Sequence, residues 1–368
     1  MKRWWKRYTK NKIMKKIFIT GFCIASLFFL SSINSARKER SHSLDDIPFT
    51  LYNLDVSKCT GFQHHTGSKV FIPQEALLFK NNKPCNTKIT FSYRELRTPS
   101  EIITADITMK YFEGKLRKDL VTSGMFEVYA ICEKETLALK PGKTINVFFA
   151  VENVETKTIA YRYDFTNSVW NNYNSPVADL SATSMYSDSV NQLWGSSPVP
   201  SLNDSSQIRG EDGEEYDIES GRRWEYENAL KNNAFKSLEI DSFGLYNYDY
   251  ILDKENYVPI VADFKILNQK APLTRMVYVV YPHINSVLYF SPYEWKTGFS
   301  ILPVEGVKIF SIMDNGNVAM LPSTDLTEQS VKSWKMKSHT FLLVENITLV
   351  QNSRQLASVT GIDQIVKK

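Results

Sequence analysis

Apolar and polar positions alternate along most of the chain between residues 49 and 167. The period of two is clearest in "KITFSYREL" and "GMFEVYAIC", whose apolar faces are Ile89, Phe91 and Tyr93, and Phe126, Val128, Ala130 and Cys132. Successive strand residues point to opposite sides, so this pattern predicts strands that bury one face. The strands recur at intervals of roughly 10–15 residues without an amphipathic helix between them, which predicts an antiparallel β-sandwich domain over 49–167.

The character of the sequence changes over residues 168–233, where Ser, Asn, Asp and Pro predominate. This composition buries too little apolar surface to offset the entropy of ordering, so we expect a long polar linker ending in a short helix. Strand patterns then return, and Asp314-Asn315-Gly316 predicts a hairpin with a type I′ turn. The expected fold class is therefore mainly β: two antiparallel β-sandwich-like domains, the second over 234–368, joined by the linker.

The N-terminus predicts export. Residues 1–16 contain eight Lys or Arg and no acid, and an uncharged, largely apolar run follows over 17–36. This is the plan of a signal peptide over 1–36. The run is also long enough, at about 20 residues, to be an uncleaved membrane anchor. Translation from Met14 instead of Met1 would give a more ordinary leader. We expect an exported protein of the periplasm, the outer-membrane surface or the membrane itself, in contact with lipid only through this segment.

Charge and cysteine content narrow the class of protein. The chain has 44 basic and 40 acidic residues, and the leader holds eight of the basic ones, which leaves 36 against 40. A slightly acidic chain has no electrostatic footprint for nucleic acid, so that partner is excluded. Beyond the leader are Cys59, Cys85 and Cys132, whose spacing matches no metal motif. We expect three buried, unpaired thiols. The alternative stays open that one pair among the three forms a disulfide and leaves one cysteine over, with Cys59 and Cys85 the nearest in sequence.

The ordered set of strands in the first half resembles a β-sandwich module of exported Bacteroidetes proteins. The segments that carry the resemblance are 71–73, 82–84, 89–96, 101–111, 124–130 and 137–147, and "FGLYNYDYI" at 243–251 resembles the opening of a second domain in the same proteins. The first module is also distantly similar to the spectrin-binding β-sandwich of ankyrins and netrin receptors. The resemblance implies a strand over 101–111, a sandwich architecture and an envelope location, and it implies no catalytic residue.

Candidate chemistry is sparse in this sequence. Tyr246, Tyr248 and Tyr250 share one face of a predicted strand, where their rings form either a glycan-stacking platform or cross-strand packing. Asp188-Ser189-Val190 resembles a short O-glycosylation acceptor, which makes Ser189 a candidate modification site. Adjacent strand residues point apart, so His64-His65 is a poor metal chelate. The acidic run at 210–219 departs from calcium-loop spacing. No catalytic, cofactor or metal site is predicted.

These features predict a non-enzymatic cell-envelope protein whose β-sandwich domains contact proteins or glycans. Two alternatives stay open: a carbohydrate-active or other hydrolase with a site between the domains, and a membrane-anchored accessory subunit of a secretion or gliding apparatus. A cleft with converging carboxylates would favour the hydrolase. An extended exposed apolar surface would favour a contact protein or a subunit of an apparatus.

Overall fold

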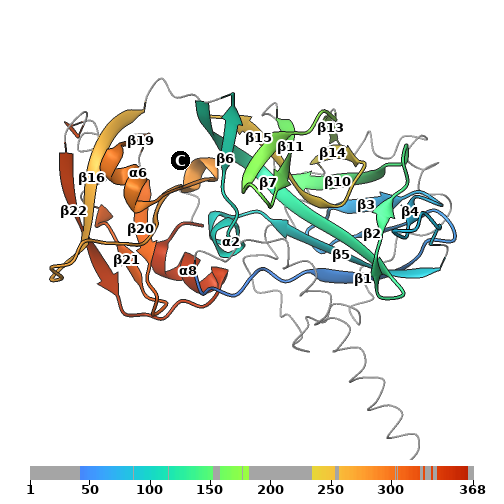
Figure 1. Cartoon of the computed structure of the whole chain (residues 1–368), viewed down its shortest axis with the longest axis horizontal. Helices are drawn as coiled ribbons and strands as arrows, with labels where there is room; N and C mark the ends of the chain where they lie inside the picture. The colour runs from blue at the N-terminus through green and yellow to red at the C-terminus, as the bar shows by residue number, and fades with distance from the viewer. Residues whose placement is uncertain are drawn as a thin grey trace, which may run out of the picture.

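The computed structural model describes residues 42–85, 87–114, 116–151, 158–175, 177–181, 234–252, 257–302, 304, 306–323, 326–327, 333–334 and 338–363. These residues form a mainly β protein, as the sequence predicts (Figure 1). The predicted leader, Ser189, the acidic run at 210–219 and the predicted helix after the linker lie outside them. Within the described ranges, no helix combines the length and the apolar character needed to cross a bilayer.

Two sheets form the first unit, a β-sandwich. The larger sheet contains, in order, β1 (Thr50–Asp55), β5 (Lys88–Leu96), β7 (Leu116–Cys132), β15 (Gly244–Ile251), β11 (Ile159–Asp164), β12 (Val169–Asn172) and β6 (Lys110–Glu113), with β8 (Glu135–Thr136) paired to β7. The smaller sheet contains β13 (Ala178–Ser181), β14 (Ala234–Ile240), β10 (Ile145–Val151), β3 (Lys69–Ile72) and β2 (Thr60–Gln63). Both predicted apolar faces, on β5 and β7, lie in the core of this sandwich, which confirms the alternating pattern. A short pair, β4 (Leu77–Leu78) and β9 (Ala138–Leu139), lies apart from both sheets.

A third sheet forms the C-terminal unit. Its order is β18 (Ser286–Phe290), β17 (Val277–Tyr281), β20 (Lys308–Ile312), β21 (Val318–Met320), β22 (Ser338–Asn346), β16 (Val258–Ile266) and β19 (Phe299–Ile301). The 3-10 helix η2 (Pro282–Ile284) joins β17 to β18. Helix α6 (Pro292–Thr297) contacts both β16 and β18, so it closes the curled sheet around a second apolar core that includes Trp295. Most strand pairs are antiparallel, as predicted, but β16 and β22 run parallel.

The strand pairing divides the chain differently from the predicted boundary at residue 234. β14 lies between β13 and β10, and β15 lies between β7 and β11, so residues 234–251 complete the sandwich. β12 and β13 belong to the same unit although they fall in the predicted linker. The C-terminal unit therefore begins at β16. Pairing between strands that are distant in sequence decides this division, and local composition does not report it.

Two predicted local structures are wrong. The segment expected to be a strand from residue 101 is helical at its start, in α2 (Pro99–Thr104). Thr98 and Glu101 form a reciprocal capping box around Pro99, and these start signals outweigh the β-branched residues that follow. The hairpin between β20 and β21 does form, but of the two central turn residues only Gly316 has a positive φ, 79°. A type I′ turn requires a positive φ at both.

A third apolar cluster joins the two units into one body. It contains Ile102, Leu120 and Leu245 from the sandwich and Tyr278 and Phe310 from the C-terminal sheet. The C-terminal helix α8 (Ser353–Thr360) packs on β21 and α2 and adds a buried leucine to the same cluster. Burial of this shared apolar surface disfavours separation of the units.

Polar contacts follow the same junction. The side-chain amide of Asn285 donates to the carbonyl of Arg97 at 2.9 Å, and the Ser286 hydroxyl donates to the carbonyl of Leu120 at 2.8 Å. Asp363, after α8, accepts hydrogen bonds from the backbone N–H and the hydroxyl of Ser100 in α2. These hydrogen bonds join α2 and β7 of the sandwich to the start of β18 and to the residues after α8.

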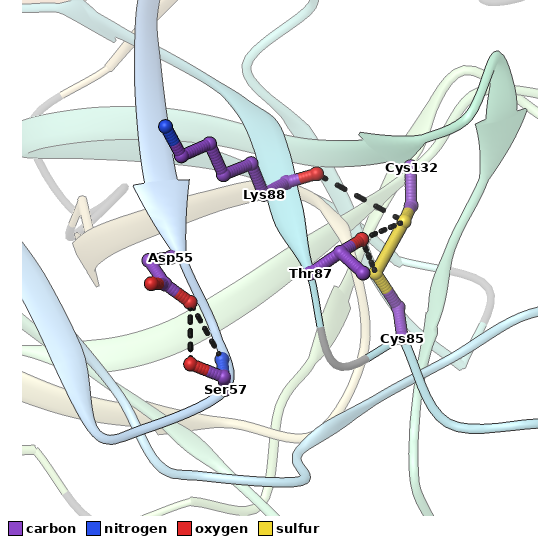
Figure 2. The surroundings of a disulfide bond; sticks show 6 residues. All are labelled: Asp55, Ser57, Cys85, Thr87, Lys88 and Cys132. Carbon is purple, nitrogen blue, oxygen red and sulfur yellow. Dashed lines mark hydrogen bonds between the residues drawn. A yellow bond between two sulfur atoms is a disulfide. The ribbon is translucent and has the colours of Figure 1, made fainter.

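Cys85 and Cys132 form a disulfide (Figure 2), and Cys59 is exposed and free. The prediction of three unpaired thiols is therefore wrong. The alternative of one disulfide with one cysteine left over is confirmed, but the partners are Cys85 and Cys132 and not the nearest pair, Cys59 and Cys85. Cys85 precedes β5 and Cys132 ends β7, and the antiparallel pairing of these two strands brings the cysteines together across 47 residues of sequence. The hydroxyl of Thr87 lies 3.4 Å from the sulfur of Cys132.

Removal of this disulfide will lower stability. The bond closes a loop of 47 residues and restricts the unfolded chain. We expect Cys85→Ala/Cys132→Ala to lower the free energy of unfolding by about 2–4 kcal/mol. Equilibrium urea unfolding measures the loss, with Cys59→Ala as the matched control. Equal stability of the double variant and the parent under oxidising conditions would contradict the assignment.

Candidate functional site

The tyrosines of the predicted glycan platform lie on β15, an inner strand of the larger sheet. Tyr246 and Tyr248 have no exposed surface. Their ring centroids lie 5.4 Å and 5.9 Å from that of Phe126, inside the sandwich core. Tyr250 is half-buried and follows a bulge in the pairing with β7. Tyr246 and Tyr248 therefore offer no face to a sugar and act as core residues.

The His64-His65 pair follows β2 and packs into the edge of the same core. His64 is 2% exposed, and its Nδ1 atom lies 2.7 Å from the hydroxyl of Tyr52. Its ring also packs against Tyr93, at a centroid distance of 4.8 Å. Within the ranges that the structure describes, no three His, Cys, Asp or Glu side chains are grouped so that they could hold a metal ion.

A buried ion pair joins Glu95, near the end of β5, to Arg97. Nε of Arg97 donates to Glu95 at 2.5 Å, while its other nitrogens donate to the carbonyl of Ala150 and the hydroxyl of Ser68. The hydroxyl of Tyr93 donates to the second oxygen of Glu95 at 2.7 Å. Burial by itself would raise the pKa of Glu95, but the charges of Arg97 and His64, with hydrogen bonds from Arg97 and Ser68, together outweigh burial and lower the pKa to about 2. Glu95 is therefore ionised and engaged on both oxygens.

A second ion pair lies on the opposite face of β5. Nε of Arg94 donates to Glu127 at 2.7 Å and Nη1 donates to Asp46 at 2.8 Å. Arg94 and Glu127 are 1% and 0% exposed, so neither charge is open to a ligand. Because successive strand residues point to opposite sides, Arg94 and Glu95 place one buried charge on each face of β5.

Asp249 is a buried acid on the side of β15 away from Tyr248. It is fully buried, and Nδ2 of Asn247 donates to its Oδ2 atom at 2.5 Å. Burial raises the pKa of Asp249 well above its usual range, although the hydroxyl of Thr122 opposes the shift. Its neutral form is favoured, but a group without exposed surface cannot meet a substrate.

An open pocket of about 170 Å³ lies where the sandwich meets the C-terminal unit. Arg117 and Asp119 of β7 line one side, and Phe290, Glu294 and residues 298–300 line the other. This is the inter-domain location that the hydrolase alternative predicted.

Arg117 is the centre of this pocket. Its Nη1 atom donates to Oε1 of Glu294 at 3.1 Å, and its Nε atom lies 3.4 Å from Oδ1 of Asp119. Its guanidinium lies 4.9 Å from the centroid of the Phe290 ring. Lys110 adds a second cation, with Nζ 3.4 Å from the same Glu294 oxygen. Two cations therefore face two carboxylates, and the local charge is balanced.

The protonation of Glu294 limits what the pocket can do. Burial by itself would raise its pKa, but the backbone N–H of Ser291 and the cations of Lys110 and Arg117 lower the pKa below the usual range. A general acid for glycoside or peptide hydrolysis needs a proton to donate near neutral pH. The ionised form of Glu294 is favoured there, so Glu294 does not suit the general-acid role, and its carboxylate is engaged by Lys110 and Arg117.

Sequence analysis did not single out Arg117, Lys110 or Glu294. One local signal was available, because Ser291 and Glu294 form the capping box that starts α6, with Pro292 at the first helical position. Arg117 and Glu294 are 177 residues apart, so no spacing pattern connects them.

Comparison with known proteins adds no relative: no protein-family model matches the chain, and no curated protein is similar to it. The resemblance to envelope β-sandwich proteins therefore stays a prediction.

The buried Glu95–Arg97 pair will make the free energy of unfolding depend on pH in the acid range. We expect Glu95→Gln to lower the free energy of unfolding by about 3 kcal/mol at neutral pH, because Arg97 loses its buried partner. Since folding depresses the pKa of Glu95 from 4.5 to about 2, its contribution is present above pH 4.5 and lost as the pH falls toward 2.

Urea unfolding of both proteins over this pH range measures the difference. Glu239→Gln, on an exposed residue of β14, is the matched control. A difference between parent and Glu95→Gln that stays constant down to pH 2 would contradict the assigned ion pair.

The ion pairs that Glu294 forms between the units will contribute less to the free energy of unfolding, and added salt will weaken their contribution. Glu294→Gln keeps the cap of α6 but removes the charge that meets Lys110 and Arg117. We expect a loss of about 1 kcal/mol at low ionic strength that shrinks with added salt. Glu113→Gln is the control, since Glu113 is 62% exposed and pairs with Lys118 within one hairpin. Equal losses in the two variants would show that the junction pairs have no special role.

Proposed function

We propose that this protein is a non-enzymatic component of the cell envelope that makes protein contacts on a rigid β framework. The observation that carries the proposal is the charge balance of the junction pocket. Two carboxylates, Asp119 and Glu294, line this pocket, and Arg117 lies against both. The pocket therefore ties β7 to α6 and stabilises the arrangement of the two units.

Two further features support an envelope role. The Cys85–Cys132 disulfide is of a kind that persists in oxidising compartments, which supports the predicted export. The apolar cluster between the units holds them as one body, and rigid surfaces bind partners at a low entropic cost. Burial of Tyr246 and Tyr248 removes the predicted aromatic platform, so protein contacts are favoured over glycan contacts.

A hydrolase with a site between the units is the second candidate. The specific observation in its favour is the position of the pocket, with Asp119 and Glu294 both at the junction. Catalysis there would require the substrate to displace Arg117 from at least one of these carboxylates.

Affinity capture distinguishes the two candidates. The tagged full chain, crosslinked in envelope extract, is expected to retain a defined envelope protein that excess untagged chain displaces. The same preparation is expected to leave a panel of glycans and peptides unchanged.

A different result would favour the hydrolase. Capture of no partner, together with turnover of a panel substrate that Asp119→Asn or Glu294→Gln abolishes, would replace the contact function by the hydrolase. Glu113→Gln serves as the control for a general effect of removing a surface charge near β6.

A further inference from the structure

Exposed apolar side chains gather at one end of the C-terminal sheet. Of the eight large apolar side chains that are exposed in the described ranges, five lie there. We call them the end patch: Leu267, Leu342, Val344, Ile347 and Leu349. Ile347 is 87% exposed, the largest value among the eight. Contiguous apolar surface of this kind marks a contact with a protein or a membrane.

The pairing of β22 explains why these side chains share one side. Phe341 and Leu343 point into the core, so Leu342 and Val344 point out. The backbone N–H of Leu267 donates to the carbonyl of Leu343 at 2.8 Å, which places Leu267 next to Val344. The end patch is thus a continuous strip across β16 and β22.

The loop after β22 extends the strip. Leu349 lies over the β20–β21 turn, where a side chain in place of Gly316 would collide with it. The backbone N–H of Val350 donates to the carbonyl of Gly316 at 2.9 Å and fixes the loop there. Ile347, at the most exposed point, therefore projects from an anchored loop.

Strand addition does not account for the end patch. β22 pairs with β16 over residues 338–343 and with β21 over residues 344–346. The end patch consists of side chains on the outer face of β22 and not of its backbone edge, which is what a peptide would use in strand addition. The contact that this surface can make is through its apolar side chains.

The described chain begins beside the same loop. The backbone N–H of Asp45 donates to the carbonyl of Gln351 at 2.7 Å, two residues beyond Leu349. His42 lies against α2, with its Nε2 atom 2.6 Å from the carbonyl of Ile103, and α2 contacts α8. Five residues lie between His42 and the end of the predicted leader at Ala36, and a chain of this length spans at most about 20 Å. The predicted leader would therefore end within reach of the loop that carries Ile347 and Leu349.

We propose that the end patch rests on a lipid bilayer, beside the point where the leader enters it. The charges around the strip are balanced, since Lys265 pairs with Asp263 at 3.4 Å and Arg275 pairs with Asp314. Attraction to anionic headgroups is therefore weak, and the contact depends on apolar insertion at the interface. The loop of Ile347 and Leu349 enters the headgroup region while the leader is in the membrane, as signal or as anchor.

This contact would orient the whole molecule. β16 has nine residues, so its two ends are about 30 Å apart. Leu267 of the end patch follows one end of β16, while β19, which continues from α6, pairs with the other end at residues 258–260 (Figure 1). The surface around α6 would face away from the bilayer and stay open to partners.

An environment-sensitive probe tests the proposal. The full chain with Cys23→Ser, Cys59→Ser and Ile347→Cys is labelled at residue 347 with a nitrobenzoxadiazole dye and reconstituted into phosphatidylcholine vesicles. We expect a blue shift and protection from an aqueous quencher. The matched control is the same dye on Tyr293→Cys, which is 77% exposed on α6 and is expected to stay aqueous.

Patch variants check that the end patch is responsible. Val344→Ser and Leu349→Ser in the labelled chain are expected to reduce the shift at 347, whereas Ile159→Ser, 43% exposed on β11, is expected to leave it unchanged. Circular dichroism confirms folding of each variant.

Three outcomes would overturn the proposal. The dye at 347 stays aqueous in vesicles, or both dyes shift equally, or the dye at 347 is already shielded without lipid. The last result would assign the end patch to a second copy of the chain. None of them depends on the affinity capture, so failure here leaves the proposed contact function separately testable.

Discussion

The structure depends on β7, a single strand that contributes side chains to two apolar cores. Phe126 and Val128 point into the sandwich, while Leu120 and Met125 belong to the cluster between the units. Leu120 and Met125 are five positions apart, so a regular strand would place them on opposite faces. The pairing with β15 shifts where Gly124 lies, and this bulge returns the strand to the junction side. The register of β7 thus couples the folding of one unit to the docking of the other.

Most charged side chains that are buried in the sandwich or at the junction are paired with an opposite charge, and Asp249, whose neutral form is favoured, is an exception. Glu95 and Arg97 are paired on one face of β5, Arg94 and Glu127 on the other, and Arg117 meets Asp119 and Glu294 between the units. Buried charges are tolerated only when they are paired and hydrogen-bonded, because desolvation of a lone ion costs far more than the fold can supply. Each of these paired groups favours one arrangement of the surfaces that it joins. Apolar packing alone would allow other arrangements.

The two ends of the folded protein differ in their surfaces. The described chain begins beside helix α8, which belongs to the junction, and the disulfide lies in the sandwich. Most of the large apolar side chains that are exposed among the described residues lie on β22, just after β16 and in the loop after β22. The proposed contact of this end patch with a bilayer would hold the two joined units in one orientation and leave their other surfaces to partners.

The amino-acid sequence alone specifies the local pattern: strands with one buried face, the hairpin turn at Gly316, the polar composition before β14 and the apolar N-terminus. These features depend on neighbouring residues, so a window of ten or so positions contains them. The capping box around Pro99 was equally local, and the strand implied for that segment was wrong because the helix start signals were not weighed. The tertiary structure alone decides that residues 234–251 complete the sandwich, that Cys85 pairs with Cys132, that Tyr246 and Tyr248 are covered, and that Arg117 meets Glu294. Each of these depends on which strands become neighbours. The packing of the whole chain determines that pairing, and the spacing of residues along the sequence does not indicate it.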